Sequence, residues 1–228
     1  MQSYGHTDPL ILAHRGGAGE APENTLEAFQ HAVDIDITHL ETDVRASING
    51  TLYLAHGATS LLPNQPLDLT PDKQRLTLAK LFDTFPEKCF TIDPKHDLAV
   101  EPLARLIVER NMQDQVCIGS SFDARTKRIV ALIKKLSGKQ PYTALVSAWD
   151  LVCLLTKIRD PNTIHAAYIH VPAKLINKST IKTAHAWDLK VVAWVLNDKP
   201  GMQRALDIGV DGFMTDRPTV AMQLVHEK

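Results

Sequence analysis

The chain has 228 residues, of which 44% are hydrophobic and 22% charged, with a formal net charge of −1 and a pI of about 6.8. This balance is typical of a globular protein and excludes general disorder, and the length suits one domain over residues 1–228. The near-zero charge argues against nucleic-acid binding and stable membrane association. Because the chain has no overall positive charge, an anionic small-molecule substrate would need a local positive site.

The N-terminal part of the chain predicts a strand, a helix and a second strand, in that order. Leu10–Ala13 is a short apolar run that predicts the first strand. Asn24 is the predicted N-cap of the helix, because a glutamate follows three residues later and the next apolar residues share one helical face. The second strand is predicted at His39–Arg45, and Asn49-Gly50 predicts a hairpin turn into an antiparallel segment over residues 51–55.

Residues 57–75 are rich in Pro, Asn and Asp and predict a loop, after which Leu76–Phe85 predicts a helix. From there, short apolar runs alternate with amphipathic segments, a pattern typical of βαβ units and a parallel sheet. Further strands are predicted at Cys89–Asp93, Val116–Gly119, Thr143–Ser147, Ala167–Val171, Val191–Leu196 and Gly212–Thr215. Helices are predicted at Glu101–Arg110, Ala124–Leu136, Leu151–Lys157, Thr180–Trp187, Met202–Ile208 and Thr219–His226.

Together with the two strands near the N-terminus, these six make eight strands with helices between them and no break in composition. That count favours a closed (β/α)8 TIM barrel over a doubly wound sheet. The loop that follows His56 is the one irregular segment, so the predicted fold is an α/β barrel with a short insertion after the second strand.

Polar residues gather where the predicted strands end. In a TIM barrel the carboxyl ends of all strands form one face, and the chemistry takes place there. Scattered surface charge would not concentrate at that recurring position. In chain order, these residues are His14, Arg15, Glu41, Asp43, Asp93, Lys95, Ser120, Ser121, Asp216 and Arg217.

Glu41 and Asp43 lie two residues apart on a predicted strand, so both carboxylates point to the same side, into the barrel mouth. Two anions held together repel each other unless a cation lies between them, and oxygen ligands suit Mg²⁺ or Ca²⁺, with Mn²⁺ as a further option. Asp93, on the next strand, is a candidate third ligand. The alternative is a structural ion pair between Glu41 and Arg45 or another base.

His14 and His56 are the candidates for acid–base catalysis, because an imidazole can take and give a proton near neutral pH. The other eight histidines are predicted to be surface or packing residues. The glycines that follow Arg15 permit close backbone approach to an anion. They do not make a dinucleotide-binding motif, because Pro22-Glu23 separates them from the helix.

Cys89, Cys117 and Cys153 are odd in number and lie in apolar stretches, which favours buried free thiols over a disulfide or a zinc site. Residues 1–9 are polar and lack the apolar core of a signal peptide, and the apolar run from Leu10 is too short to span a membrane. The predicted location is therefore cytoplasmic. No feature of the sequence predicts the oligomeric state.

Seven segments, in order along the chain, resemble the glycerophosphodiester phosphodiesterase family. The last of them, which closes the predicted barrel, is the most similar, and the agreement in order is far more specific than any single motif. The segments are His14-Arg15-Gly16, Pro22-Glu23-Asn24-Thr25, Glu41-Thr42-Asp43-Val44, Leu54-Ala55-His56, Gly119-Ser120-Ser121-Phe122-Asp123, Trp194-Val195-Leu196-Asn197 and Gly209–Pro218.

This resemblance implies a TIM barrel that splits glycerophosphodiesters into glycerol 3-phosphate and an alcohol, with a divalent cation as cofactor. It implies that His14 and His56 are the catalytic acid–base pair and that the metal ligands are Glu41, Asp43 and Asp93. It further implies a substrate-binding set of Arg15, Lys95 and Trp194.

The sequence departs from the family pattern at two positions of the predicted site. Gly57 stands where the family usually has Asp, and Asp93 stands where it usually has Glu. Two alternatives therefore stay open. One is a phospholipase D-type enzyme acting on lysophospholipids, for which the loop tip Leu61-Leu62-Pro63 could supply an apolar rim. The other is a catalytically weakened barrel that binds phosphorylated ligands.

Overall fold

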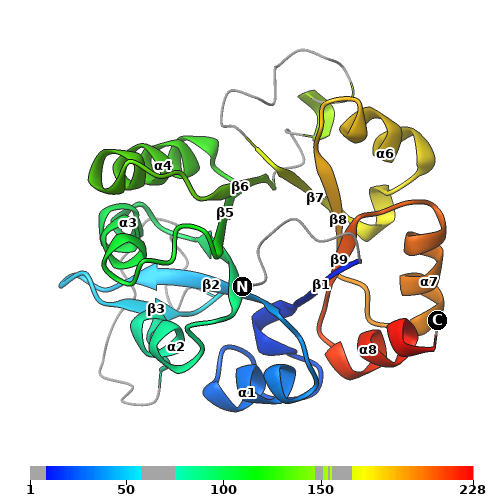
Figure 1. Ribbon diagram of the computed structural model, residues 1–228, viewed down its shortest axis with the longest axis horizontal. Helices are drawn as coiled ribbons and strands as arrows, with labels where there is room; N and C mark the ends of the chain where they lie inside the picture. Colours follow the sequence, from blue (N-terminus) through cyan, green and yellow to red (C-terminus); the bar gives the residue numbers. More distant parts are fainter. Residues whose placement is uncertain (1–8, 58–74, 147–150, 154, 156–165, 228) are drawn as a thin grey trace.

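Eight parallel strands close into a barrel in the computed structural model, which describes residues 9–57, 75–146, 151–153, 155 and 166–227 (Figure 1). Closure is shown by β1, which pairs in parallel with both β2 and β9. The parallel strands are β1 (Leu10–Ala13), β2 (His39–Ala46), β4 (Cys89–Pro94), β5 (Val116–Ser120), β6 (Tyr142–Leu145), β7 (Tyr168–Pro172), β8 (Lys190–Trp194) and β9 (Gly212–Thr215). The (β/α)8 TIM barrel predicted from the strand count is confirmed.

A ninth strand, β3 (Leu52–Leu54), runs antiparallel to β2 and forms the predicted hairpin. Residues 58–74 of the predicted insertion, with the proposed apolar tip at Leu61-Leu62-Pro63, lie outside the described residues. Residues 154, 156 and 157 of the predicted helix Leu151–Lys157 also fall outside them, whereas residues 151–153 and 155 are helical.

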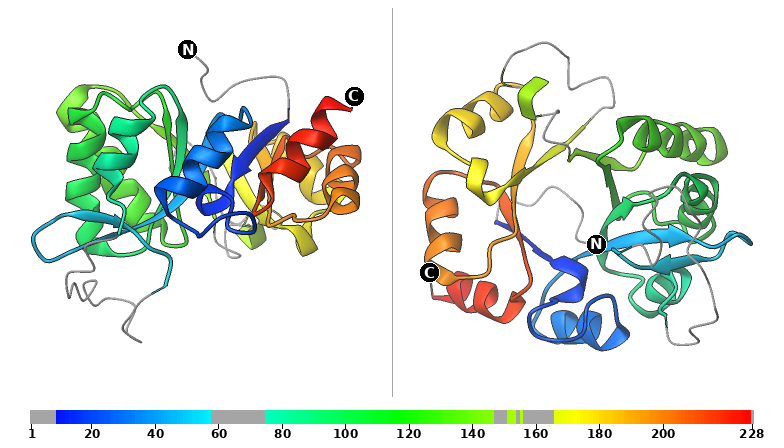
Figure 2. Two further views of the ribbon diagram at one scale, coloured as in Figure 1. Left: turned by 90° about the horizontal axis from the view of Figure 1, so that it is seen from below. Right: turned by 180° about the vertical axis from the view of Figure 1, so that it is seen from behind.

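Helices surround the barrel and cover the outer faces of its strands (Figures 1 and 2). Period-2 alternation along the strands separates two apolar clusters. In β1, Ile11 and Ala13 pack outward against the helices, whereas Leu12 points into the barrel with residues such as Tyr168 and Met214. The helices are α1 (Leu26–Asp34), α2 (Leu78–Thr84), α3 (Val100–Glu109), α4 (Asp123–Ser137), α6 (Lys178–His185), α7 (Lys199–Asp207) and α8 (Pro218–His226).

The predicted N-cap of the first helix is wrong by one residue. Thr25 caps α1, and its side-chain oxygen accepts a hydrogen bond from the backbone N–H of Ala28. Asn24 is instead buried at a φ of 58°, and its side-chain oxygen accepts a hydrogen bond from the hydroxyl of Thr42. Asparagine tolerates this left-handed conformation better than most residues do, so the tertiary contact takes the side chain that local capping would have used.

The three cysteines are buried thiols that take part in no disulfide, as predicted. None of the helices within the described ranges combines the length and the apolar character that a membrane crossing needs.

Replacing Gly212 with alanine is expected to destabilise the protein by about 1–3 kcal/mol, because it overpacks the β1–β9 seam that closes the barrel. An added Cβ would lie 2.3 Å from the carbonyl oxygen of Leu10 and 2.6 Å from its Cβ. The free energy of unfolding in urea measures the effect. Gly57→Ala is the matched control, since nothing lies within 4 Å of its added Cβ, and it should stay within about 0.5 kcal/mol of the parent. Equal stability of the two variants would contradict this closure.

Candidate active site

A cavity of about 250 Å³ opens where the carboxyl ends of the barrel strands meet. All eight residues predicted for catalysis, metal binding and substrate binding line it, although they come from distant parts of the sequence. The described residues that line it are His14, Arg15, Glu41, Asp43, His56, Thr91, Asp93, Lys95, Gly119, Ser121, Val146, His170, Trp194 and Met214.

A tight turn after β1 brings His14 and Arg15 into the cavity. Arg15 has a φ of 51°, and Gly16 and Gly17 follow with φ values of 84° and 103°. These left-handed conformations favour glycine, and a Cβ on Gly16 would also lie only 2.9 Å from the Cβ of Ala28 on α1. The glycine pair thus turns the chain sharply and lets it pack against the first helix.

His14 is held by a carboxylate from the far end of the chain. Its Nδ1 lies 2.5 Å from Oδ1 of Asp216, and Nδ2 of Asn197 donates a hydrogen bond of 2.7 Å to the other oxygen of Asp216. Burial alone would lower the pKa of His14, but the hydrogen bond to Asp216 and the charge of Glu41 outweigh burial and raise that pKa. Asp216 therefore orients the ring and favours its protonated form.

Asp216 had no predicted role beyond its place at the end of the last strand. Its position could have indicated a contact with His14. Once the barrel closes, the residue that follows β9 must lie beside the residue that follows β1. Burial would raise the pKa of Asp216, but its hydrogen bonds with His14 and Asn197 outweigh burial and lower that pKa.

His56 stands in a different environment. It follows β3, and the segment is tied to β2 by a hydrogen bond of 2.9 Å from the N–H of Ala55 to the carbonyl of Asp43 and by one of 3.3 Å from Arg45 to the carbonyl of His56. Burial lowers the pKa of the His56 imidazole. The two histidines thus have pKa values shifted in opposite directions, which is an arrangement that suits one acid and one base.

Glu41 is buried beside the turn and accepts a hydrogen bond of 3.0 Å from the backbone N–H of Arg15. Its Oε2 lies 3.9 Å from Nε2 of His14. Burial, together with the charge of Asp43, raises the pKa of Glu41 to about 8. The expected repulsion between the two carboxylates of β2 is therefore present in the protein.

Lys95 lies between two of the acidic residues. Its Nζ is 2.8 Å from Oδ1 of Asp43 and 2.5 Å from Oδ2 of Asp93. The second oxygen of Asp43 lies 3.0 Å from Nε of Arg15, yet neither atom of that pair has a hydrogen-bond partner. Asp43 thus forms ion pairs with Arg15 and Lys95. For Glu41, to which the structural alternative applied, the base within 4.0 Å among the described residues is His14 and not Arg45.

The donor set fits a hard divalent cation by its chemistry. Glu41, Asp43 and Asp93 offer carboxylate oxygens in one cavity, and Oδ2 of Asp43 is a buried acceptor without a hydrogen bond. Burial raises the pKa of Asp93, as it does that of Glu41, and a bound cation would relieve both penalties. Within the described ranges, no three His, Cys, Asp or Glu side chains are already grouped around one metal position.

His170 is one of the histidines predicted to be surface or packing residues, and no sequence pattern placed it in the site. It lies on β7, is only 5% exposed and lines the cavity together with Trp194 of the neighbouring strand. Strand alternation alone could not have identified it, because the two faces of a barrel strand are both buried.

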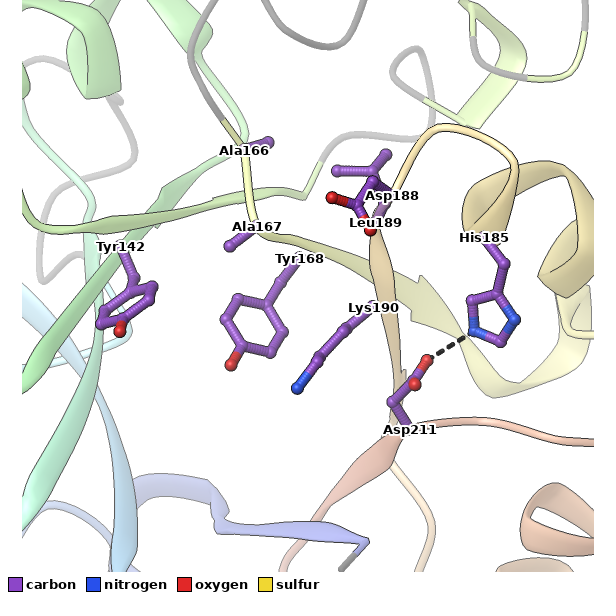
Figure 3. Close-up of a pocket in the computed structure, with 9 residues that line it drawn as sticks. All are labelled: Tyr142, Ala166, Ala167, Tyr168, His185, Asp188, Leu189, Lys190 and Asp211. Carbon is purple, nitrogen blue, oxygen red and sulfur yellow. Dashed lines mark hydrogen bonds and ion pairs between the residues drawn. The ribbon is translucent and has the colours of Figure 1, made fainter. Parts of the chain in front are cut away.

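A larger cavity of about 570 Å³ lies at the opposite end of the barrel, where strands β6 to β9 begin (Figure 3). It contains a histidine–carboxylate pair, with Nε2 of His185 2.8 Å from Oδ2 of Asp211, and that oxygen also accepts a hydrogen bond of 2.7 Å from the N–H of Val191. This pair links the last residue of α6 to the residue that precedes β9. TIM-barrel catalysis takes place at the carboxyl ends of the strands, so the smaller cavity is the candidate active site.

Comparison with known proteins gives one consistent family. The chain matches the Glycerophosphoryl diester phosphodiesterase family over residues 14–84 and 73–220. It is 26% identical to the glycerophosphodiester phosphodiesterase of Caldanaerobacter subterraneus, with 96% of this chain and 98% of the relative covered. It is 24% identical to the human lysophospholipase D GDPD1, with 94% and 85% covered.

Solved structures show the same fold. A phosphodiesterase of Oleispira antarctica in complex with the product sn-glycerol-3-phosphate superposes with a TM-score of 0.77 at 18% identity, covering 96% of this chain and 97% of that one. A glycerophosphodiester phosphodiesterase of Thermotoga maritima superposes with a TM-score of 0.76 at 20% identity, covering 96% and 99%.

Proposed function

The chain belongs to the glycerophosphoryl diester phosphodiesterase family, and we propose that it hydrolyses glycerophosphodiesters to glycerol 3-phosphate and an alcohol. The observation that carries this proposal is the convergence of His14 and His56 with three carboxylates on one cavity. The product named for the Oleispira antarctica phosphodiesterase supports the proposed product of this chain.

The two histidines divide the proton transfers. His14 is paired with Asp216 and so fits the acid, whereas no carboxylate in the described part of the chain hydrogen-bonds the His56 ring, which fits the base. A hydroxyl, from water or from the glycerol itself, gives its proton to His56 as its oxygen bonds to phosphorus. His14 gives a proton to the departing alkoxide as the P–O bond breaks. If the glycerol hydroxyl attacks, the cyclic phosphate is then opened by water.

Positive charge is needed where the phosphodiester lies. Arg15 and Lys95 line the cavity and are the basic residues proposed to contact the phosphate, and Trp194 is proposed to contact the rest of the substrate. Glu41, Asp43 and Asp93 would hold a divalent cation, Mg²⁺ or Ca²⁺ with Mn²⁺ as an option, which when bound supplies charge that stabilises the non-bridging oxygens.

Asp216→Asn is expected to move the basic limb of the pH–activity profile to lower pH by about 1 to 2 units, since a hydrogen bond to a charged group contributes roughly 1.5–3 kcal/mol. The acid must be protonated, so activity falls as pH rises through the pKa of His14. Asp216 raises that pKa, so removal of its charge lowers the pKa of His14. The profile of kcat/KM against pH measures the shift. Asp211→Asn, which breaks the His185 pair, should leave the limb in place.

A substrate panel tests the proposed function. Glycerophosphocholine, glycerophosphoethanolamine and a lysophosphatidylcholine are offered with Mg²⁺, Ca²⁺ or Mn²⁺, and phosphomonoester and alcohol release are measured. We expect turnover of the first two, because the cavity of about 250 Å³ is below the ~300–1,000 Å³ that drug-sized ligands occupy. Preference for the lysophospholipid would favour the activity named for human GDPD1. Binding of these diesters without release of any product would support the weakened barrel and refute the proposal.

A further inference from the structure

The lining of the active-site cavity is divided by charge. The acids, the bases and the two proposed catalytic histidines come from the first part of the barrel, up to β4 and the residue that follows it. The opposite side comes from the end of β6 and from β7 to β9, and none of the described residues on it is a carboxylate, lysine or arginine. We call this side the neutral wall, and it consists of Val146, His170, Trp194 and Met214.

His170 is the unusual member of the neutral wall. On β7, Ile169 and Val171 pack outward among the helices, whereas Tyr168 points into the barrel, and His170 follows the same inward alternation. Within the described part of the chain, its ring has no hydrogen bond and no ion pair. Burial is the one cause that shifts the pKa of His170, and it lowers that pKa to about 4. The imidazole is therefore neutral at neutral pH.

Trp194, on the adjacent strand β8, adds a second unsatisfied group to the same wall. Its indole Nε1 is buried and has no hydrogen-bond partner. Buried polar groups nearly always find partners in folded proteins, so groups that line a binding cavity without one are suited to a ligand. A neutral imidazole offers one donor and one acceptor, and an indole offers one donor. A hydroxyl group, which both donates and accepts, complements this set.

We propose that His170 is a specificity-determining residue that hydrogen-bonds the glycerol hydroxyls of the substrate while the phosphate lies against the charged side of the cavity. The proposal rests on the proposed function, because it takes a glycerophosphodiester as the occupant. Charge separates the two ends of that occupant. The phosphate is attracted to Arg15 and Lys95, and the uncharged polyol faces the neutral wall, whose described residues carry no charge.

Two ligands with the same carbon chain isolate this contact. Glycerol 3-phosphate carries two hydroxyls, and n-propyl phosphate carries none. Titration calorimetry with each, in the presence of Mg²⁺, needs no turnover, so it can fail independently of the proposed function. The parent protein is expected to bind glycerol 3-phosphate at least tenfold more tightly than n-propyl phosphate.

His170→Leu is expected to weaken glycerol 3-phosphate binding roughly five- to tenfold, as for the loss of about one hydrogen bond, and to change n-propyl phosphate binding less than twofold. His170→Asn, which keeps a donor and an acceptor, should retain part of the preference. His170→Phe also removes both groups and decides the question if the leucine variant does not fold. Met214→Leu, on the same wall, should change both affinities by the same factor.

Three results would overturn the proposal: a parent protein with no preference for glycerol 3-phosphate, a His170→Leu or His170→Phe variant that loses both ligands equally, or one that keeps the full preference. Hydrolysis that fails for every diester, with the preference and its loss still observed, would instead refute the proposed function and leave the assignment of His170 to hydroxyl recognition intact.

Discussion

Replacing His14 with alanine is expected to lower kcat for glycerophosphocholine by about 10²- to 10⁴-fold, the usual contribution of a positioned general acid or base. His14 is the residue that the structure pairs with Asp216, at 2.5 Å. The other two histidines in the described lining, His56 and His170, form no such pair, so neither can replace His14 as the oriented proton donor. His56→Ala is expected to have an effect of the same order, because removal of either imidazole interrupts the same proton path.

The double variant should be hardly slower than the slower single variant, since groups that act as a unit have non-additive effects. Steady-state kinetics over a range of pH measures kcat and KM separately for each variant. His185→Ala is the matched control, because His185 lies at the opposite end of the barrel and pairs with Asp211. Its kcat should equal that of the parent. If the His14→Ala variant kept more than a tenth of the parent rate, the assigned role of His14 would be wrong.

Removal of divalent cations is the second change with a large expected effect. Treatment with EDTA is expected to reduce turnover to background, and excess Mg²⁺, Ca²⁺ or Mn²⁺ is expected to restore it. The reason is electrostatic: Glu41 and Asp43 are buried together, and burial raises the pKa of Glu41 to about 8 without a cation. Carboxylates in that arrangement are suited to binding a cation and are unfavourable without one.

Glu41→Gln tests the same point without a chelator. It keeps the shape of the side chain but removes its charge, and we expect Mn²⁺ affinity, measured by calorimetry, to fall at least ~10-fold. That is the lower end of what loss of an outer-shell partner of a metal costs.

The metal-free variant should also lose the pH dependence of stability that Glu41 contributes. A carboxyl with a raised folded-state pKa stabilises the fold at low pH, and that contribution is lost as pH rises from about 4.5 to about 8.

Glu101→Gln is the control for this variant, because Glu101 forms an exposed pair with Arg105 on the surface of α3. Its Mn²⁺ affinity and turnover should match those of the parent. Full activity of the parent after exhaustive chelation would contradict the proposed metal dependence, and it would leave Lys95 and Arg15 as the charges that act on the phosphate.

Much of the fold could be predicted from the sequence because each strand is a short apolar run with a helix on either side. β1 and β9 were predicted to the residue, and the bounds of the other parallel strands differ by one or two residues, the usual scatter at the ends of elements. Periodicity works well for such repeats. The capping pattern failed at Asn24, where a contact with Thr42 outweighed the local capping preference.

The candidate site was predictable as a set but not as a network. Residues at strand ends must converge once a barrel closes, so His14, Arg15, Glu41, Asp43, Asp93 and Lys95 could be named without a structure. His56 was proposed for its chemistry, and Trp194 was implied by the family resemblance. The contacts between these side chains could not be predicted. The pairing of His14 with Asp216 spans 202 residues, and the inward direction of His170 depends on which face of β7 forms the barrel interior. Spacing in the sequence carries no information about either.

The central claim is that the acids and the two histidines act together on a glycerophosphodiester in this one cavity. Phosphorus NMR of glycerophosphocholine incubated with the protein and Mg²⁺ tests it most directly, because each possible product has its own signal. We predict conversion to glycerol 3-phosphate that stops on addition of EDTA and is at least about 100-fold slower in the His14→Ala variant. Appearance of choline phosphate instead, or a substrate signal that never decays with any of the three cations, would contradict the claim.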